Sequence, residues 1–202
     1  ICRDAGLRLV VPRDSAAAPA TTPISAPMAN RPVNIEDLLA RPGSGIDEQR
    51  VAKLIAGNTV LVTGAGGSIG SMLCEEIARF NPATLILLDQ SEYSLYRVDE
   101  QFARKLPDVR RICLVGDVRQ RGRMEQLLAR YRPEVVFHAA AYKHVPLLEA
   151  DNAWEALRNN VVGTEVIARA AMHAGVDRFV LISTDKAVNP VSVMGASKRM
   201  AE

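Results

Sequence analysis

The chain contains 202 residues, 48% of them hydrophobic and 24% charged, with a formal net charge of +2. This composition is typical of one globular core with an appendage, and it excludes a disordered chain. The mild charge does not indicate a nucleic-acid partner, and we interpret Arg119, Arg121 and Arg123 as a solvated helix face. No run approaches the roughly 18 apolar residues of a membrane span, and the cysteines show neither disulfide nor metal-ligand spacing.

The amino-terminal part of the chain does not read as part of the main domain. Residues 7–11 predict one short strand, which fits the tail of a preceding domain at residues 1–13. Residues 14–32 are rich in Ala, Pro, Ser and Thr, as linkers are. Asn34 is a candidate N-cap of a short helix. We therefore assign residues 14–57 to a linker and a short helix.

From residue 58 to residue 202, apolar β-branched runs alternate with stretches of helix length. The first such stretch carries Ile69, Leu73, Ile77 and Phe80 on one side, which predicts an amphipathic helix with this side toward the core. Strands that are apolar nearly throughout are typical of a parallel sheet with helices on both faces. We therefore predict a doubly wound α/β fold of the Rossmann type, without its carboxy-terminal substrate lobe. The predicted strands are 59–63, 85–89, 112–116, 135–139 and 179–183.

A glycine-rich string connects the first predicted strand to the first predicted helix. Glycines permit a tight turn and a close approach of the backbone to a pyrophosphate, and free N–H groups at a helix N-terminus attract the anion. Because strand, glycines and helix follow in this order, a purely structural turn is the weaker interpretation. With Thr63 the string reads TGxxGxxG, which resembles the extended short-chain dehydrogenase/reductase family. The predicted cofactor contacts in this string are Gly64, Gly67, Ser68, Ile69 and Gly70.

Acidic residues follow the second and third predicted strands. Asp89 stands where a carboxylate accepts hydrogen bonds from the adenine ribose and repels a 2′-phosphate. Because residues 90–92 contain no arginine, we predict NAD rather than NADP; the alternative is that Asp89 caps the following turn. Asp117 and Val118 stand where short-chain dehydrogenases contact adenine, although Asp117 is also a candidate helix cap.

Small residues follow the fourth predicted strand and would let the chain pass close under the cofactor, although tight packing alone explains them equally well. They are Ala139, Ala140 and Ala141. Tyr142, Lys143 and His144 come next, near the same edge of the sheet, and are candidate contacts to the substrate. The alternative for these three residues is a solvated loop.

The fifth predicted strand brings Thr184, Asp185 and Lys186 to the carboxyl edge of the sheet, where open α/β folds bind ligands. Short-chain dehydrogenases carry Ser or Thr there and Tyr-x-x-x-Lys on the next helix, with both side chains on one helix face. Here Met194 occupies the Tyr position and Lys198 the Lys position. Since methionine cannot transfer a proton, Asp185 and Lys186 are the remaining acid and base. The alternatives are an ordinary loop ion pair for these two residues and a solvated side chain for Lys198.

Four segments together resemble the membrane-associated UDP-N-acetylglucosamine 4,6-dehydratases of bacterial polysaccharide biosynthesis, over about residues 35–202. They are TGAGGSIGS, LLDQSEYSLY, HAAAYKHVPLLE and STDKAVNPVSVMGASKRMAE. Members of this family replace the Tyr by Met and use the Thr-Asp-Lys trio, so Met194 supports the resemblance. The resemblance implies membrane helices in an absent amino-terminal region and a location at the cytoplasmic side of the inner membrane. It is compatible with a homo-oligomer, and we expect this fragment to be soluble and inactive by itself.

The resemblance also implies an internal redox cycle on a nucleotide sugar with bound NAD. Hydride leaves carbon 4, Lys186 removes the proton on carbon 5, Asp185 protonates the hydroxyl that departs from carbon 6, and hydride returns to carbon 6. Thr184 would bind the oxygen on carbon 4, and Lys198 would hold the nicotinamide ribose. These roles require a neutral Lys186 and a protonated Asp185, which a closed site of low dielectric favours.

Two other functions compete with this one. A nucleotide-sugar 4-epimerase shares the fold and the cofactor, but it ordinarily needs the Tyr that Met194 replaces. A non-catalytic NAD-binding scaffold would leave the grouping of Thr184, Asp185, Lys186 and Lys198 unexplained.

Overall fold

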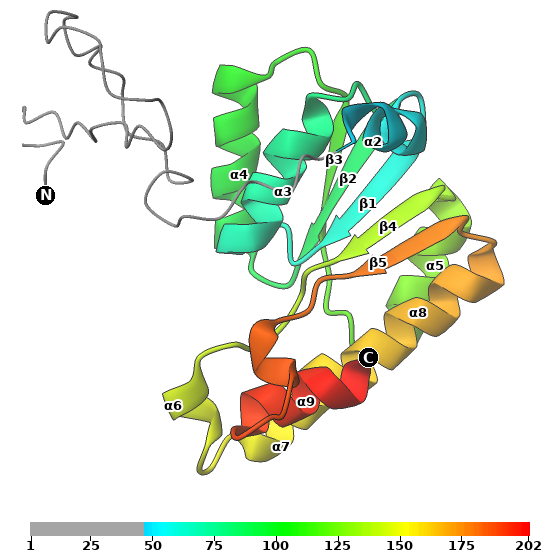
Figure 1. Cartoon of the computed structure of the whole chain (residues 1–202). Coiled ribbons are helices and arrows are strands. Elements are labelled where there is room, and N and C mark those ends of the chain that lie inside the picture. The colour runs from blue at the N-terminus through cyan, green and yellow to red at the C-terminus, as the bar shows by residue number, and fades with distance from the viewer. Residues whose placement is uncertain (1–46) are drawn as a thin grey trace, which may run out of the picture. The chain divides into compact units, whose positions relative to one another are not determined.

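The computed structural model describes residues 47–202, which form a five-stranded parallel sheet with helices on both faces (Figure 1). The strands are β1 (Thr59–Thr63), β2 (Thr84–Asp89), β3 (Arg111–Val115), β4 (Val135–His138) and β5 (Arg178–Leu181). The longer helices are α2 (Glu48–Ile55), α3 (Ser68–Ala78), α4 (Glu92–Lys105), α5 (Arg121–Tyr131), α8 (Gly163–Ala174) and α9 (Val193–Ala201). The shorter ones are α6 (Val145–Leu148), α7 (Ala153–Leu157), the π-helix η1 (Arg158–Val162) and the 3₁₀ turn η2 (Asp185–Ala187). The predicted doubly wound α/β fold is confirmed, whereas the predictions for residues 1–46 lie outside the described residues.

The two faces of the sheet bury separate apolar clusters because successive strand residues point to opposite sides. On one face, Val60 and Val62 of β1 pack with Leu85 of β2 against α3 and α4. On the other face, Leu61 and Ile86 pack against α5 and α8. Each central strand is therefore apolar along both sides, as the sequence pattern predicts.

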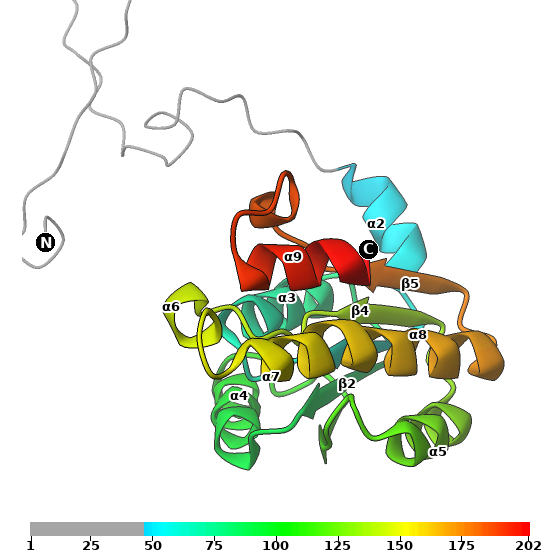
Figure 2. The same cartoon turned by 90° about the horizontal axis from the view of Figure 1, so that it is seen from below.

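The strand order β3-β2-β1-β4-β5 creates a crevice at the carboxyl edge of the sheet. The chain runs outward from β1 through β2 to β3 and then returns to place β4 on the other side of β1. The loops after β1 and β4 therefore leave the sheet in opposite directions, and open α/β folds bind ligands in the gap between such loops. Helix α9 lies beside α7 and η1, at the end where α8 begins (Figure 2).

The strand boundaries agree with the sequence to within one or two residues, and the differences lie at strand ends. β4 and β5 end before the predicted 139 and 183, although the next N–H groups still bond across the sheet: Ala139 to the Thr63 oxygen and Ile182 to the His138 oxygen, each at 3.0 Å. The regular pairing ends there because the backbone turns into the crevice.

Two features of the first helices differ from the predictions. Helix α2, within the segment 14–57 assigned to a linker and short helix, buries Ile55 against the core, so the domain begins before residue 58. Ile69, which the predicted apolar stripe turned inward, is 53% exposed because it lies in the first turn of α3, at the crevice. Cys74 takes its place in the core beside Ile77. Among residues 47–202, no helix has the length and apolarity needed to cross a membrane.

Candidate functional site

The loop after β1 presents its backbone to the crevice. Gly64 has a φ of +68°, and a Cβ on it would lie 2.6 Å from the backbone nitrogen of Ala140. A Cβ on Gly70 would overlap the Gly64 carbonyl oxygen, and the Gly67 N–H donates to that same oxygen at 3.0 Å. Only glycine fits Gly64 and Gly70, and the bare turn leaves the first N–H groups of α3 without intrahelical partners. This geometry fits the pyrophosphate of a dinucleotide.

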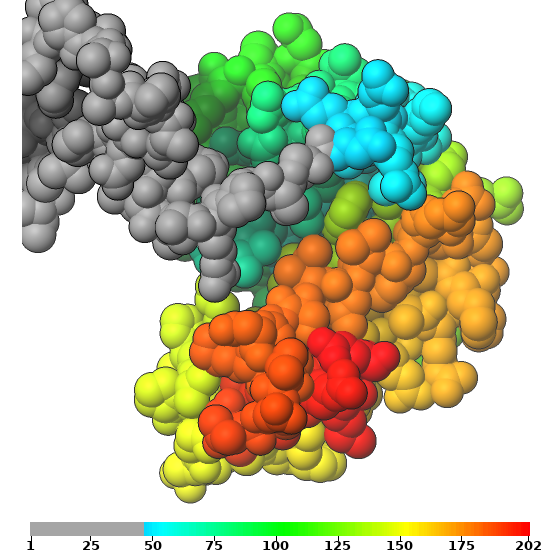
Figure 3. Space-filling view, viewed as in Figure 1, coloured from blue at the N-terminus to red at the C-terminus, as the bar shows by residue number. Residues whose placement is uncertain are grey.

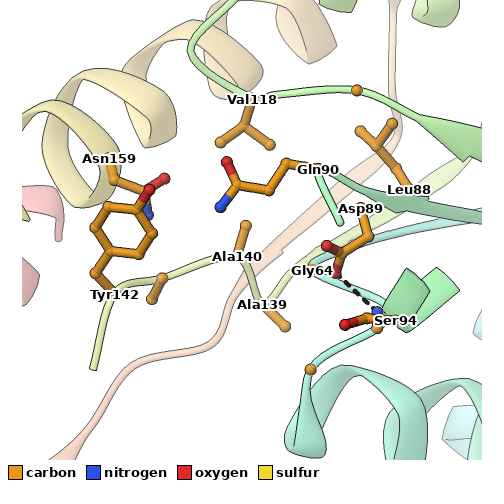
Figure 4. A pocket seen from close by; sticks show the side chains of 14 residues that line it. Gly64, Leu88, Asp89, Gln90, Ser94, Val118, Ala139, Ala140, Tyr142 and Asn159 are labelled. Carbon is orange, nitrogen blue, oxygen red and sulfur yellow. Dashed lines mark hydrogen bonds between the residues drawn. The ribbon is translucent and has the colours of Figure 1, made fainter. Parts of the chain in front are cut away.

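Asp89 lies at the carboxyl end of β2 with both carboxylate oxygens engaged (Figure 4). Its Oδ2 accepts from the Gly66 N–H and its Oδ1 from the Ser91 N–H, each at 2.8 Å. The turn-capping alternative therefore describes part of its role, and the same side chain also braces the phosphate loop. A carboxylate offers about four acceptor positions, so Asp89 can still accept from ribose hydroxyls.

Asp117 forms an ion pair with Arg119, which the sequence pattern assigned to a solvated helix face. Arg119 donates from Nη2 to Asp117 Oδ2 at 2.6 Å, and the two side chains are only 24% and 18% exposed. Arg119 precedes α5, so its prediction as part of a solvated helix face is wrong, and the N-cap of α5 is Gln120 rather than Asp117. Burial by itself would raise the pKa of Asp117, but the hydrogen bonds and charge of Arg119 outweigh burial and lower it. Asp117 is therefore an anion that is already paired.

Two cavities in the crevice collect most of the predicted residues. We call them the first cavity, next to β2, and the second cavity, next to β5. The predicted cofactor contacts that line the first cavity are Gly64, Gly67, Asp89, Val118, Ala139, Ala140 and Ala141. The second cavity contains Ser68, Ile69, Gly70, Lys143, Thr184, Lys186, Met194 and Lys198. Asp117 lines a neighbouring hollow instead, and Asp185 lines neither cavity.

The turn that carries Thr184, Asp185 and Lys186 stands at the surface (Figure 3). The Thr184 hydroxyl donates to Asp185 Oδ1 at 3.0 Å, and Lys186 Nζ lies 3.6 Å from the same oxygen. The hydrogen bond from Thr184, followed by the charge of Lys186, lowers the pKa of Asp185. The side chains are 88% exposed for Asp185 and 54% for Lys186. Without substrate, Asp185 and Lys186 thus form the ordinary loop ion pair of the alternative interpretation.

Lys198 and Met194 lie on the inward side of α9, four residues apart. Lys198 is 4% exposed and donates from Nζ to the Ile182 carbonyl at 2.6 Å, so the solvated alternative is wrong. Burial lowers the pKa of Lys198. Met194 is also 4% exposed and packs with Leu148 and Ala156.

The three residues after the alanine run, residues 142–144, lie in different surroundings. Lys143 donates from Nζ to the Ser68 hydroxyl at 2.7 Å, which places its charge at the start of α3. His144 precedes α6 and lines a third cavity, between α6 and α7, together with Leu147. Tyr142 lines all three cavities.

Sequence reasoning missed a pair of buried asparagines in η1. Asn159 lines the first cavity (Figure 4). Asn160 accepts from the Tyr142 N–H at 2.8 Å and donates to the Tyr142 carbonyl at 3.0 Å and to the Ser197 hydroxyl at 2.9 Å. Two adjacent amides next to the apolar pair Val161 and Val162 were the available signal, because buried polar groups need partners.

Comparison with known proteins agrees with this geometry. The family model described as "Polysaccharide biosynthesis protein" matches residues 60–202. The probable polysaccharide biosynthesis protein EpsC of Bacillus subtilis is 48% identical over 85% of this chain and 29% of its own length. A UDP-N-acetylglucosamine 4,6-dehydratase (inverting) of Campylobacter jejuni is 32% identical over 70% of this chain and 41% of its own length. A UDP-glucose 4-epimerase of Rickettsia massiliae is 35% identical, with 71% and 41% covered.

Solved structures share the fold. Pen from Bacillus thuringiensis superposes with a TM-score of 0.67 at 30% identity, over 73% of this chain and 45% of its own. The Bordetella bronchiseptica enzyme WbmG, solved in complex with NAD, superposes with a TM-score of 0.60 at 25% identity, over 72% and 48%. The chain thus spans less than half the length of each of these proteins. Because the family model covers the whole sheet and both cavities, the chain belongs to the polysaccharide biosynthesis protein family.

Proposed function

We propose that this chain is the cofactor-binding part of an NAD-dependent nucleotide-sugar 4,6-dehydratase that acts on UDP-N-acetylglucosamine or a close analogue. One observation carries the proposal: Thr184, Lys186 and Lys198 line one cavity with Met194, beside the phosphate loop. The proposed base therefore lines the cavity where a phenol is absent, and the proposed acid, Asp185, lies beside it at the surface, 3.6 Å from Lys186 Nζ. The match to the Campylobacter jejuni dehydratase supports the same substrate class.

NAD fits the residues that face the crevice. The bare turn at Gly64 to Gly70 accommodates a pyrophosphate, and Asp89 offers acceptors for ribose hydroxyls but none of the positive charge that a 2′-phosphate needs. Lys143 adds a cation at the start of α3, on the side of the pyrophosphate. When bound, NAD would supply the reversible hydride acceptor that oxidises carbon 4 of the sugar and later reduces carbon 6.

The residues of this chain would move the protons. Oxidation at carbon 4 releases the proton of its hydroxyl to solvent and acidifies the proton on carbon 5, which Lys186 Nζ takes. Asp185 gives its proton to the hydroxyl on carbon 6, which leaves as water. Lys186 returns a proton to carbon 5 after carbon 6 has been reduced, and solvent then restores the proton that the ion pair has lost. Thr184 holds the oxygen on carbon 4, and Lys198 supplies positive charge beside it. The net change is the loss of one water.

Asp185 and Lys186 form an ion pair in the site without substrate, so the sugar must cover their turn before elimination can begin. Asp185 is ionised at neutral pH, because its pKa lies below the ordinary value, and Lys186 is its ion-pair partner. A sugar that covers both side chains removes water from them and favours the neutral pair. Proton transfer from Lys186 to Asp185 then gives the base and the acid that elimination requires.

The test is incubation of the full-length protein with UDP-N-acetylglucosamine, followed by mass spectrometry of the nucleotide sugar. A dehydratase removes one water, whereas an epimerase leaves the mass unchanged and a scaffold turns nothing over. Deuterium placed on carbon 4 should reappear on carbon 6 of the product. Loss of that label to solvent would contradict the internal return of hydride.

Lys186→Ala separates the two half-reactions. We expect reduced cofactor to accumulate on the enzyme without dehydrated sugar, with turnover about 10²- to 10⁴-fold lower, as for loss of a general base. The matched control is Lys53→Ala, which removes an exposed lysine on α2 that lines none of the three cavities. Turnover of Lys186→Ala near that of the control would contradict the proposed role of Lys186 as the base.

A further inference from the structure

The two cavities share five lining residues, which we call the junction, and one of these has a large side chain. The residues that line both are Gly64, Gly67, Ala139, Ala141 and Tyr142. Four of these have at most a methyl group, so Tyr142 is the one junction residue whose side chain can act on whatever passes between the cavities. Figure 4 shows its ring at the end of the first cavity opposite Asp89, next to Asn159.

The ring is carried on a fixed backbone. Asn160 binds both the N–H and the carbonyl of Tyr142, at 2.8 and 3.0 Å, and is itself 1% exposed. The Tyr142 side chain packs against a small apolar cluster that contains Leu148 and Met194. Rotation of the backbone would break two hydrogen bonds and leave the buried Asn160 amide without these partners, which is costly. Tyr142 is therefore a preorganised wall and not a loose loop side chain.

We propose that Tyr142 is a cofactor-retention residue, whose ring closes over the dinucleotide opposite the phosphate loop. This inference rests on the proposed function, because a dinucleotide that reaches from Asp89 to Lys198 must cross the junction between the two cavities. It reassigns Tyr142 from the sugar, where the sequence placed it, to the cofactor. Retention of the cofactor matters in an internal redox cycle. If the reduced cofactor left after the oxidation at carbon 4, no hydride would be available for the reduction at carbon 6.

Release of NADH from the full-length protein tests the proposal directly. The protein is loaded with NADH, mixed with a large excess of NAD, and the loss of bound-NADH fluorescence gives the dissociation rate. Tyr142→Ala should release NADH about tenfold faster, because the aromatic contact is lost. Tyr142→Phe should stay within about twofold of the parent, because the ring and not the hydroxyl closes the junction.

Two further variants keep the result interpretable. Tyr142→Leu preserves apolar contact with Leu148 and Met194 but lacks the reach of the ring, so it should still speed release severalfold even if Tyr142→Ala folds poorly. Leu147→Ala is the matched control, because Leu147 is 65% exposed and lines only the third cavity.

Parent-like release rates in both Tyr142→Ala and Tyr142→Leu overturn the proposal, as does equal acceleration in Leu147→Ala. A parent protein that binds no NADH would contradict the proposed function as well. The failure of the inference alone is distinct from this, because the parent would then bind NADH and the variants would match it.

Discussion

His138 should make this domain lose stability between neutral and mildly acidic pH. The side chain is fully buried at the end of β4, between the hydroxyls of Thr63 and Thr164, at 2.6 and 2.9 Å. The Thr164 hydroxyl donates to the Asn160 carbonyl, so His138 Nε2 must donate to Thr164 and Nδ1 must accept from Thr63. The neutral ring satisfies every partner. A second proton would bury an uncompensated charge near Lys198.

The magnitude follows from the pKa of His138, which burial and then the charge of Lys198 lower from 6.5 to about 3. Between these values the unfolded chain binds a proton that the folded chain does not, so stability falls as pH falls, by about 1.4 kcal/mol per pH unit. The loss from pH 7 to pH 5 is about 2 kcal/mol, and it should be present below pH 6.5 and absent above it.

Urea unfolding followed by circular dichroism at pH 7, 6 and 5 measures this loss. The comparison variant is His138→Gln, which can still donate and accept but does not titrate. The variant should be less stable at pH 7 and should lack the additional loss toward pH 5. Parallel pH profiles for parent and variant would refute the reasoning, whatever their absolute stabilities.

Three further predictions address the site. Asp89→Ala should narrow the preference for NAD over NADP and weaken the binding of both cofactors, because the Gly66 N–H of the phosphate loop loses its carboxylate acceptor; equal affinity of the parent for both cofactors, by titration, would contradict this. Gly195→Ala should slow elimination and cost about 1–3 kcal/mol of stability, because its Cβ would overlap the Lys186 carbonyl oxygen. Gly122→Ala, whose Cβ would meet nothing within 4 Å, is the control: it should match the parent in elimination, and it should be at least as stable because alanine favours the helix α5. Met194→Ala should cost about 2–5 kcal/mol in thermal or urea unfolding but far less turnover than Lys186→Ala, and a comparable loss of turnover would give the sulfur a chemical role.

Features that depend on local sequence could be predicted from it. The five strands are largely apolar runs, and the central ones, β1, β2 and β4, are buried on both faces, a pattern that needs no knowledge of neighbouring strands to be recognised. The phosphate loop is equally local, because strand, glycines and helix follow one another within one stretch of chain. Because parallel strands end at the same edge of a sheet, the predicted strands were enough to bring Asp89 and Thr184 to one edge.

The state of each side chain in the site depended on partners far away in sequence, which only the tertiary structure decided. Asn160 reaches back 18 residues to Tyr142, and Lys198 reaches 16 residues to the Ile182 carbonyl. The burial that makes Lys198 a weaker base arises from how α9 packs on the sheet. Asp185 differs, because its sequence neighbours Thr184 and Lys186 keep it an anion. Residue types and their spacing determined which chemical groups meet in this protein. Because hydrogen bonding and desolvation depend on the three-dimensional neighbours of each group, only the folded structure decided their charges and their freedom to move.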